Sequence, residues 1–229
     1  MGFIADIRQK KKFKKISYSQ CGEDLLIQFI FDQLKIKNPS YLDIGAHHPF
    51  YLSNTALMYE NGSTGVNIEP DPDLFKNFLK HRRKDKNLNI GIGESEGFAN
   101  FYHISTPTLN TFSKHEAENY INEGDYRITR LSNIEVNTLK KVIQHYCANK
   151  FADFLNIDAE GIDELIIKSI DFSDNYPIVI CIETISFSTS GRGVKNAELI
   201  KRICNEGYIL YADTYINSIF VRDNVWKDQ

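Results

Sequence analysis

The 229-residue chain lacks several features that would mark a membrane or secreted protein. Its longest apolar runs, such as residues 178–182, are far too short to cross a bilayer. No apolar segment near the start precedes a small-residue cleavage site, so we expect a cytoplasmic protein. The four cysteines are widely separated and show no paired spacing. This favours free thiols in a reducing compartment and argues against a zinc site.

Two phosphate-binding motifs are also missing. The chain has no Gly-x-Gly-x-x-Gly turn and no Gly-Lys-Ser/Thr loop, in which backbone N–H groups would hold the phosphates of a cofactor. These absences argue against a cofactor that is held through its diphosphate.

Charge is unevenly distributed along the chain. Residues 1–16 contain six basic side chains and one acid, while the rest holds 21 basic and 29 acidic residues. The simpler interpretation of residues 1–18 is a solvated basic arm, and weak contact with an anionic membrane surface is the alternative. The acidic remainder argues against a nucleic-acid partner. A homo-oligomer stays open.

The sequence has the composition of a soluble enzyme domain, with 42% hydrophobic and 25% charged residues. Apolar strand patterns alternate with amphipathic helix patterns, which predicts a mostly parallel α/β sheet with helices on both faces. We expect strands at 41–45, 64–69, 88–92, 98–104, 153–158 and 178–183, a terminal antiparallel pair at 208–212 and 218–222, and helices at 20–34, 54–59, 73–84, 139–147, 162–169 and 194–205.

Residues 105–135 differ from the rest because they are polar and show no clear period. Loops of this length in compact domains are often functional. We therefore predict one domain over residues 19–229, with an insertion at about 105–135 that lies near the substrate.

Four predicted strands end in an acid: Asp43, Glu69, Asp158 and Glu183. Ligands of parallel sheets bind outside the carboxyl ends of the strands, so these acids indicate a site. Glu69 follows Asp43 by 26 residues, a spacing that suits a carboxylate accepting ribose hydroxyls. A ribose-binding acid without a diphosphate loop favours a nucleoside cofactor, and S-adenosylmethionine is the common one.

The motifs around these acids resemble those of the FkbM-type S-adenosylmethionine-dependent methyltransferases. The matching segments are 19–24 (SQCGED), 43–55 (DIGAHHPFYLSNT), 65–71 (GVNIEPD), 88–92 (LNIGI) and 154–161 (FLNIDAEG), in the family's order. The resemblance implies a Rossmann-like class I methyltransferase sheet of seven strands with a reversed last strand. It also implies O-methylation, often of sugars, glycans or natural products.

The resemblance and the strand-end rule together give the candidate site. The expected cofactor-binding residues are Gln20, Asp43, Gly45, Ala46, Asn54, Glu69, Pro70 and Asp158. The chain departs from the common family pattern in two places: His47-His48-Pro49 replaces an Asn-x-Gly type of turn, and Asn156 stands where Lys is frequent.

Methyl transfer to a hydroxyl needs a group that withdraws the proton, either a base or a metal ion. The catalytic candidates are Asp158, Glu160, His47 and His48. Asp158, Glu160 and Glu183 are candidate ligands for magnesium or manganese, because hard cations prefer carboxylate oxygens. Capping of the following helix is the alternative role for Glu160.

The acceptor predicted from the resemblance is a hydroxyl of a sugar or nucleotide-activated sugar used for a surface glycan. A small natural product is the alternative acceptor. A nicotinamide-dependent oxidoreductase and a non-catalytic binding module are the rival classes. The first would require the missing glycine-rich turn, and the second predicts loss of the acids that are present.

Overall fold

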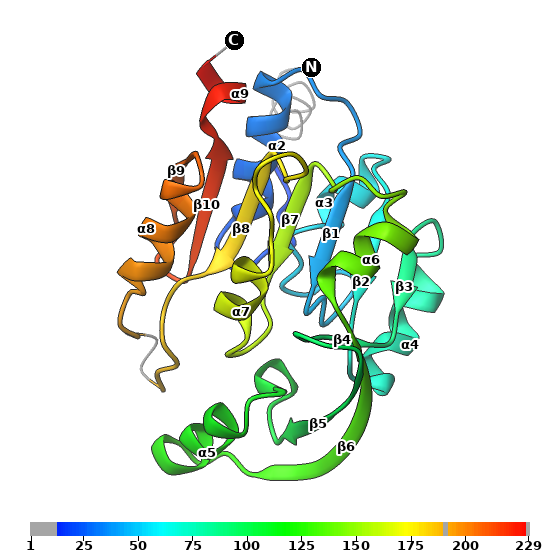
Figure 1. Cartoon of the computed structure of the whole chain (residues 1–229), viewed down its shortest axis with the longest axis vertical. Coiled ribbons are helices and arrows are strands. Elements are labelled where there is room, and N and C mark those ends of the chain that lie inside the picture. The colour runs from blue at the N-terminus through cyan, green and yellow to red at the C-terminus, as the bar shows by residue number, and fades with distance from the viewer. Residues whose placement is uncertain (1–12, 190–191, 228–229) are drawn as a thin grey trace, which may run out of the picture.

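A seven-stranded sheet forms the centre of the protein in a computed structural model that describes residues 13–189 and 192–227 (Figure 1). Its strand order is β3-β2-β1-β7-β8-β10-β9. The strands are β1 (Tyr41–Ile44), β2 (Gly65–Ile68), β3 (Lys86–Leu88), β7 (Phe154–Ile157), β8 (Val179–Glu183), β9 (Tyr208–Asp213) and β10 (Asn217–Arg222). β10 runs antiparallel to both of its neighbours, and the other pairings are parallel. The predicted sheet with a reversed last strand is confirmed.

Helices cover both faces of this sheet, because its central strands are apolar on both sides. α6 (Leu139–Tyr146), α7 (Asp163–Lys168) and α8 (Ala197–Asn205) bury their apolar side chains against one face. α2 (Glu23–Gln33), α3 (Ala56–Glu60) and α9 (Asp223–Lys227) pack on the other. α4 (Pro72–His81) connects β2 to β3, and Asp71 caps it by accepting a hydrogen bond from the Asp73 backbone N–H.

A second, three-stranded sheet follows β3 and lies at the bottom of the view in Figure 1. It consists of β4 (Gly91–Ile92), β6 (Ile128–Asn137) and β5 (Gly97–Ile104), in that spatial order. The 3₁₀ turn η1 (Pro107–Leu109) and helix α5 (Lys114–Glu123) connect β5 to β6. A small cluster around Ile104, Ala117 and Tyr120 holds α5 against this sheet.

Two sequence predictions need correction here. The expected strand at 88–92 is interrupted, because the Asn89 side chain donates hydrogen bonds to the Glu69 and Pro70 carbonyls and turns the chain from β3 into the second sheet. The expected loop at 105–135 contains η1, α5 and most of β6. Only Ala117 and Tyr120 of α5 are buried, so this helix has almost no apolar period to detect.

The basic arm lies mostly outside the described residues, which begin at Phe13. The prediction of contact with a membrane surface therefore falls largely on residues without a described structure. Within the described part, no helix has the length and apolar character needed to span a membrane.

Candidate functional site

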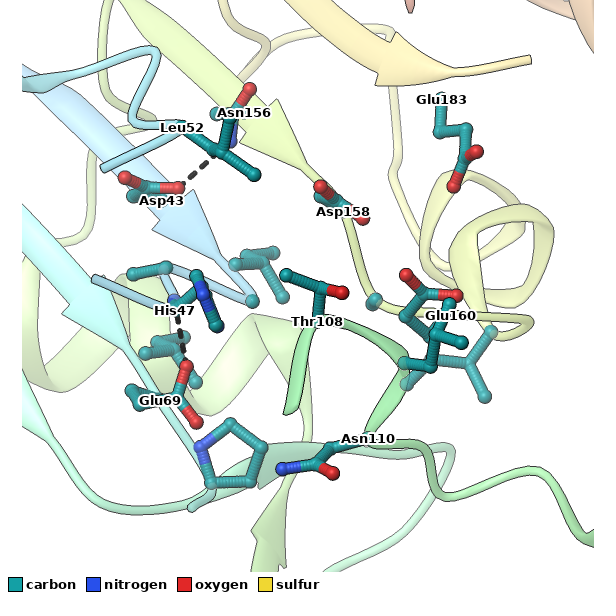
Figure 2. A pocket seen from close by; sticks show the side chains of 18 of the residues that line it. Asp43, His47, Leu52, Glu69, Thr108, Asn110, Asn156, Asp158, Glu160 and Glu183 are labelled. Atoms are coloured by element: carbon teal, nitrogen blue, oxygen red, sulfur yellow. Dashed lines mark hydrogen bonds between the residues drawn. The ribbon is translucent and has the colours of Figure 1, made fainter. Parts of the chain in front are cut away.

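A cavity of about 310 Å³ opens at the carboxyl ends of β1, β2, β7 and β8. The predicted site residues gather around it, with one exception, His48 (Figure 2). Those that line the cavity are Gln20, Asp43, Gly45, Ala46, His47, Asn54, Glu69, Pro70, Asp158, Glu160 and Glu183. The cavity thus lies at the edge of the sheet where the strand-end rule predicts a ligand.

The turn after β1 requires glycine at position 45. Gly45 has a φ of 78°, and a Cβ at this position would lie 1.7 Å from the backbone oxygen of Asp158. The backbone N–H groups of Gly45 and Ala46 both donate to the Ile68 carbonyl at the end of β2. This turn therefore joins three neighbouring strand ends and leaves an open space in front of them.

Glu69 is a buried carboxyl with fixed orientation. One oxygen accepts a hydrogen bond from the His47 N–H and the other from the Asp71 N–H, both at 2.7 Å. Burial raises the pKa of Glu69 to about 8, although these two hydrogen bonds oppose that shift. Each oxygen retains a lone pair for a hydroxyl donor.

A buried network beneath the cavity fixes Asp43. Its two oxygens accept hydrogen bonds from Thr55 Oγ1 at 2.7 Å and Asn156 Nδ2 at 2.8 Å. Asn156 also accepts a hydrogen bond from Asn54 Nδ2, which lines the cavity. Burial raises the pKa of Asp43. Asn156, one of the two departures from the family pattern, is therefore part of the support for the cofactor end of the cavity.

The network extends to Arg82, a functional residue that the sequence analysis missed. Its fully buried guanidinium donates to Thr55 Oγ1, to Tyr41 Oη and to the Pro49 carbonyl, and it pairs with Asp85 at 2.9 Å. Arg82 therefore links the loop that follows β1 to the hydroxyl that holds Asp43. No local signal could have revealed it, because the hydrogen-bond partners of the guanidinium other than Asp85 lie at least 27 residues away.

His48 does not reach the cavity, unlike His47. Its Nδ1 atom accepts hydrogen bonds from the backbone N–H groups of Phe50 at 3.2 Å and Tyr51 at 2.9 Å. The side chain thus stabilises the turn after β1, and the structure gives no support to its predicted role as a base. Burial lowers the pKa of His47, so its imidazole is neutral at pH 7.

Three carboxylates meet at the opposite end of the cavity. Asp158, Glu160 and Glu183 each place an oxygen within 4.8 Å of the other two (Figure 2). Asp158 is exposed to the open cavity, yet desolvation by the surrounding protein, and then the charges of Asp163 and Asp43, raise its pKa to about 7. Burial and the neighbouring Asp158 and Glu160 raise the pKa of Glu183 to about 10. Such a group favours a bound cation or shared protons, because like charges at this spacing repel.

Glu160 does not cap α7, so that alternative is wrong. No described side chain caps α7, and the Asp163 carboxylate instead fixes the preceding turn by accepting hydrogen bonds from the backbone N–H groups of Ala159 and Gly161. Glu160 has a φ of 45° and receives a hydrogen bond from the Tyr120 hydroxyl at 2.6 Å. Its position beside Asp158 is therefore set by α5 of the second sheet.

β5 and the segment between β5 and α5 also supply residues over the cavity. Thr108, Asn110, Phe101 and Phe112 line it from this side. Asn110 Nδ2 donates to Asp71 Oδ2 at 2.9 Å, next to the Glu69 backbone segment, and Asn110 Oδ1 accepts from the Ile104 N–H. The predicted placement of residues 105–135 near the site thus agrees with the geometry.

Glu23, the first residue of α2, joins the 19–22 segment to the hairpin formed by β9 and β10. Glu23 accepts hydrogen bonds from the Cys21 N–H, from Thr214 Oγ1 at 2.6 Å and from Asn217 Nδ2 at 3.1 Å. These bonds hold the 19–22 segment beside the loop before β10, and both Gln20 and Asn217 line the cavity.

Comparison with known families decides the class of protein. The family model described as "Methyltransferase FkbM domain" matches residues 43–210, most of the chain. This chain belongs to the FkbM methyltransferase family. The family is one of methyltransferases, which sets the nicotinamide-dependent oxidoreductase aside. The residues of the cavity fit S-adenosylmethionine, the cofactor that the family implies. Gly45 leaves room in front of the strand ends, and the two Glu69 oxygens are free to accept hydrogen bonds from ribose hydroxyls.

A comparison with solved structures gives matches to methyltransferases at low sequence identity. A methyltransferase FkbM from Methylobacillus flagellatus KT is 11% identical with a TM-score of 0.43, and the match covers 92% of this chain and 45% of that one. A TehB-like SAM-dependent methyltransferase from Corynebacterium glutamicum is 11% identical with a TM-score of 0.42, covering 96% of both chains. This FkbM chain thus spans about half the length of the Methylobacillus protein. A search of curated proteins gave no match.

Proposed function

We propose that this FkbM methyltransferase transfers the methyl group of S-adenosylmethionine to a hydroxyl of a sugar, either free or nucleotide-activated, during synthesis of a surface glycan in the cytoplasm. The observation that supports the proposal is the group of three carboxylates at one end of the cavity, opposite the expected ribose acceptor Glu69 (Figure 2). A hydroxyl is a poor nucleophile until its proton is withdrawn, and a carboxylate of this group is suited to accept that proton.

The cofactor end is expected to bind through residues of the β1 and β2 ends. Glu69 would accept the ribose hydroxyls, and the turn at Gly45 would contact the methionine portion. The cofactor supplies an electrophilic methyl group on a sulfonium. With the cofactor bound, the acceptor oxygen would take the methyl group from the sulfonium sulfur, and one of the three carboxylates would accept the hydroxyl proton.

Asp158 is the preferred proton acceptor. Its raised pKa of about 7 matches the pH at which a base must both lose and take up a proton. Figure 2 places it between the cofactor end and Glu160. His47 is less suited, since its side chain lies beside Glu69 at the opposite end.

A divalent cation gives a second route through the same residues. Asp158, Glu160 and Glu183 offer the oxygen donors that Mg²⁺ and Mn²⁺ prefer, from two adjacent strand ends. A cation held there would lower the pKa of the acceptor hydroxyl and would offset the repulsion among the carboxylates.

The test is methyl transfer to a panel of sugars, nucleotide-sugars and small hydroxylated natural products, measured by mass spectrometry. Asp158→Asn should abolish turnover at saturating cofactor. A chelator separates the two routes, because it stops only a metal-dependent reaction. If no panel sugar gains 14 mass units while a natural product does, the natural-product alternative replaces this proposal.

A further inference from the structure

Two consecutive residues of the segment between η1 and α5 contact opposite ends of the cavity. The Asn110 side chain donates to Asp71 Oδ2 at 2.9 Å, beside Glu69 at the ribose end. The Thr111 side chain donates to the Glu160 carbonyl at 2.6 Å, at the carboxylate end. In Figure 2, Asn110 lies below and between Glu69 and Glu160. The ribose end is therefore attached to the second sheet as well as to the main one.

Neighbouring contacts fix the orientation of the Asn110 amide. Its Oδ1 accepts a hydrogen bond from the Ile104 N–H at 2.8 Å, so Nδ2 is the atom that faces Asp71. The next residue, Thr111, exchanges backbone hydrogen bonds with Tyr102 of β5 at 2.8 and 3.1 Å. The second sheet thus sets the position of the amide donor.

Asp71 connects this donor to Glu69. The Asp71 backbone N–H donates to Glu69 Oε1 at 2.7 Å, one of the two hydrogen bonds that orient the buried carboxyl. The Asp71 side chain is buried and uses both oxygens, because Oδ1 accepts from the Asp73 N–H and Oδ2 accepts from Asn110. The N–H and the carboxylate belong to one residue, so anchoring the carboxylate also fixes where the N–H points.

His103 of β5 makes a second contact with the same oxygen. Its Nδ1 lies 3.1 Å from Asp71 Oδ2, and its Nε2 lies 2.9 Å from Ser132 Oγ of β6. Since His103 would remain in place, removing the Asn110 amide alone should loosen the Asp71 segment without unfolding it.

We propose that Asn110 is a positioning residue of the donor site, which holds Glu69 in place for the ribose hydroxyls by anchoring Asp71. This inference rests on the proposed function, in which Glu69 accepts those hydroxyls. It adds that the second sheet, which covers the acceptor end, also sets the affinity for S-adenosylmethionine. A charge-assisted hydrogen bond weakens when its geometry departs from the optimum, so a loosened Glu69 should bind ribose less well.

The test is calorimetric titration of the full chain with S-adenosylhomocysteine, in the wild type and in Asn110→Ala. The dissociation constant should rise about fivefold or more in the variant, as expected for loss of one buried hydrogen bond that supports the ribose contact. Asn100→Ala is the matched control, because it removes the same amide from the same sheet. Asn100 is exposed on β5 and does not line the cavity, so this variant should bind as the wild type does.

A second probe separates positioning from direct contact, since Asn110 itself lines the cavity. An analogue of S-adenosylhomocysteine that lacks both ribose hydroxyls gains nothing from a well-placed Glu69. The affinity of Asn110→Ala for this analogue should therefore stay within about twofold of the wild-type value.

The inference is overturned if Asn110→Ala binds S-adenosylhomocysteine as tightly as the wild type, or if Asn100→Ala weakens binding equally. It is also overturned if Asn110→Ala loses the same affinity for both probes, because Asn110 would then contact the cofactor directly. A wild-type chain that does not bind S-adenosylhomocysteine would refute the inference and the proposed function together. If the binding pattern holds but no sugar is methylated, the proposed function is wrong and the role of Asn110 stands.

Discussion

The raised pKa of Glu69 predicts that cofactor binding releases a proton. The carboxyl has a pKa of about 8 in the free protein, compared with an ordinary value of 4.5. In the proposed complex, ribose hydroxyls would donate hydrogen bonds to it, and these bonds would stabilise the ionised form. The cofactor should therefore bind the ionised carboxylate, which is the minor form at pH 7.

The size of the effect follows from the pKa. At pH 7, one unit below the pKa, about nine tenths of the carboxyl is protonated, so ionising it costs about 1.4 kcal/mol. The dissociation constant of S-adenosylhomocysteine should fall about tenfold between pH 7 and pH 9, and about 0.9 proton should be released on binding at pH 7. At pH 9 the release from Glu69 should almost vanish.

Calorimetry in two buffers with different ionisation enthalpies measures this proton release directly. Glu69→Gln is the control for protons released by other groups, because it keeps the shape and removes the titration. A wild-type chain that releases no more protons than this variant would refute the reasoning, because Glu69 would then be either ionised before binding or absent from the ribose contacts.

Further predictions test the rest of the site. Gly45→Ala should destabilise the fold by about 3 kcal/mol or more, measured by urea unfolding, because its Cβ would overlap the Asp158 backbone oxygen. Asp158→Asn should lower kcat at least ~100-fold while the cofactor dissociation constant stays within a few-fold of wild type. Without added metal, Glu183→Gln should raise Tm at pH 8 but not at pH 4. An unfolded glutamate ionises near pH 4.5, whereas the folded one stays protonated until its pKa of about 10, so wild-type stability is lost as pH rises between these values. His48→Ala should cost about 1 kcal/mol of stability and leave kcat near normal at saturating cofactor; a large fall in kcat would restore it as a catalytic residue.

The fold was most predictable from the sequence in the buried strands, where few residue types fit. The central strands are short apolar runs buried on both faces. An acidic residue followed by a turn marks where each of these strands ends. The acids at these ends therefore identified the edge that holds the cavity. The glycine at position 45 was detectable for the same reason, since the turn excludes any side chain there.

The remainder depends on contacts between residues far apart in the chain. The break at Asn89 comes from a side chain that bonds to carbonyls 19 and 20 residues away. The neighbouring histidines are alike in sequence, yet only His47 reaches the cavity, because the turn directs His48 toward its own backbone. Arg82 directly follows the surface helix α4, and only the folded structure shows that its side chain is buried within the network that holds Asp43.

The two ends of the site are built by different segments of the chain, because the second sheet and its helix cover one of them. The ribose side comes from residues before 92, whereas the cover over the other end comes from the segment between β4 and α6. β4 and the end of β6 pair through Gly91 and Val136, so this segment leaves and rejoins the main body at neighbouring points. It can therefore be transplanted as one continuous piece. Exchange of residues 93–135 between family members, with His103 and Asn110 retained because they contact Asp71 beside the ribose side, offers a direct route to enzymes with new acceptor preferences.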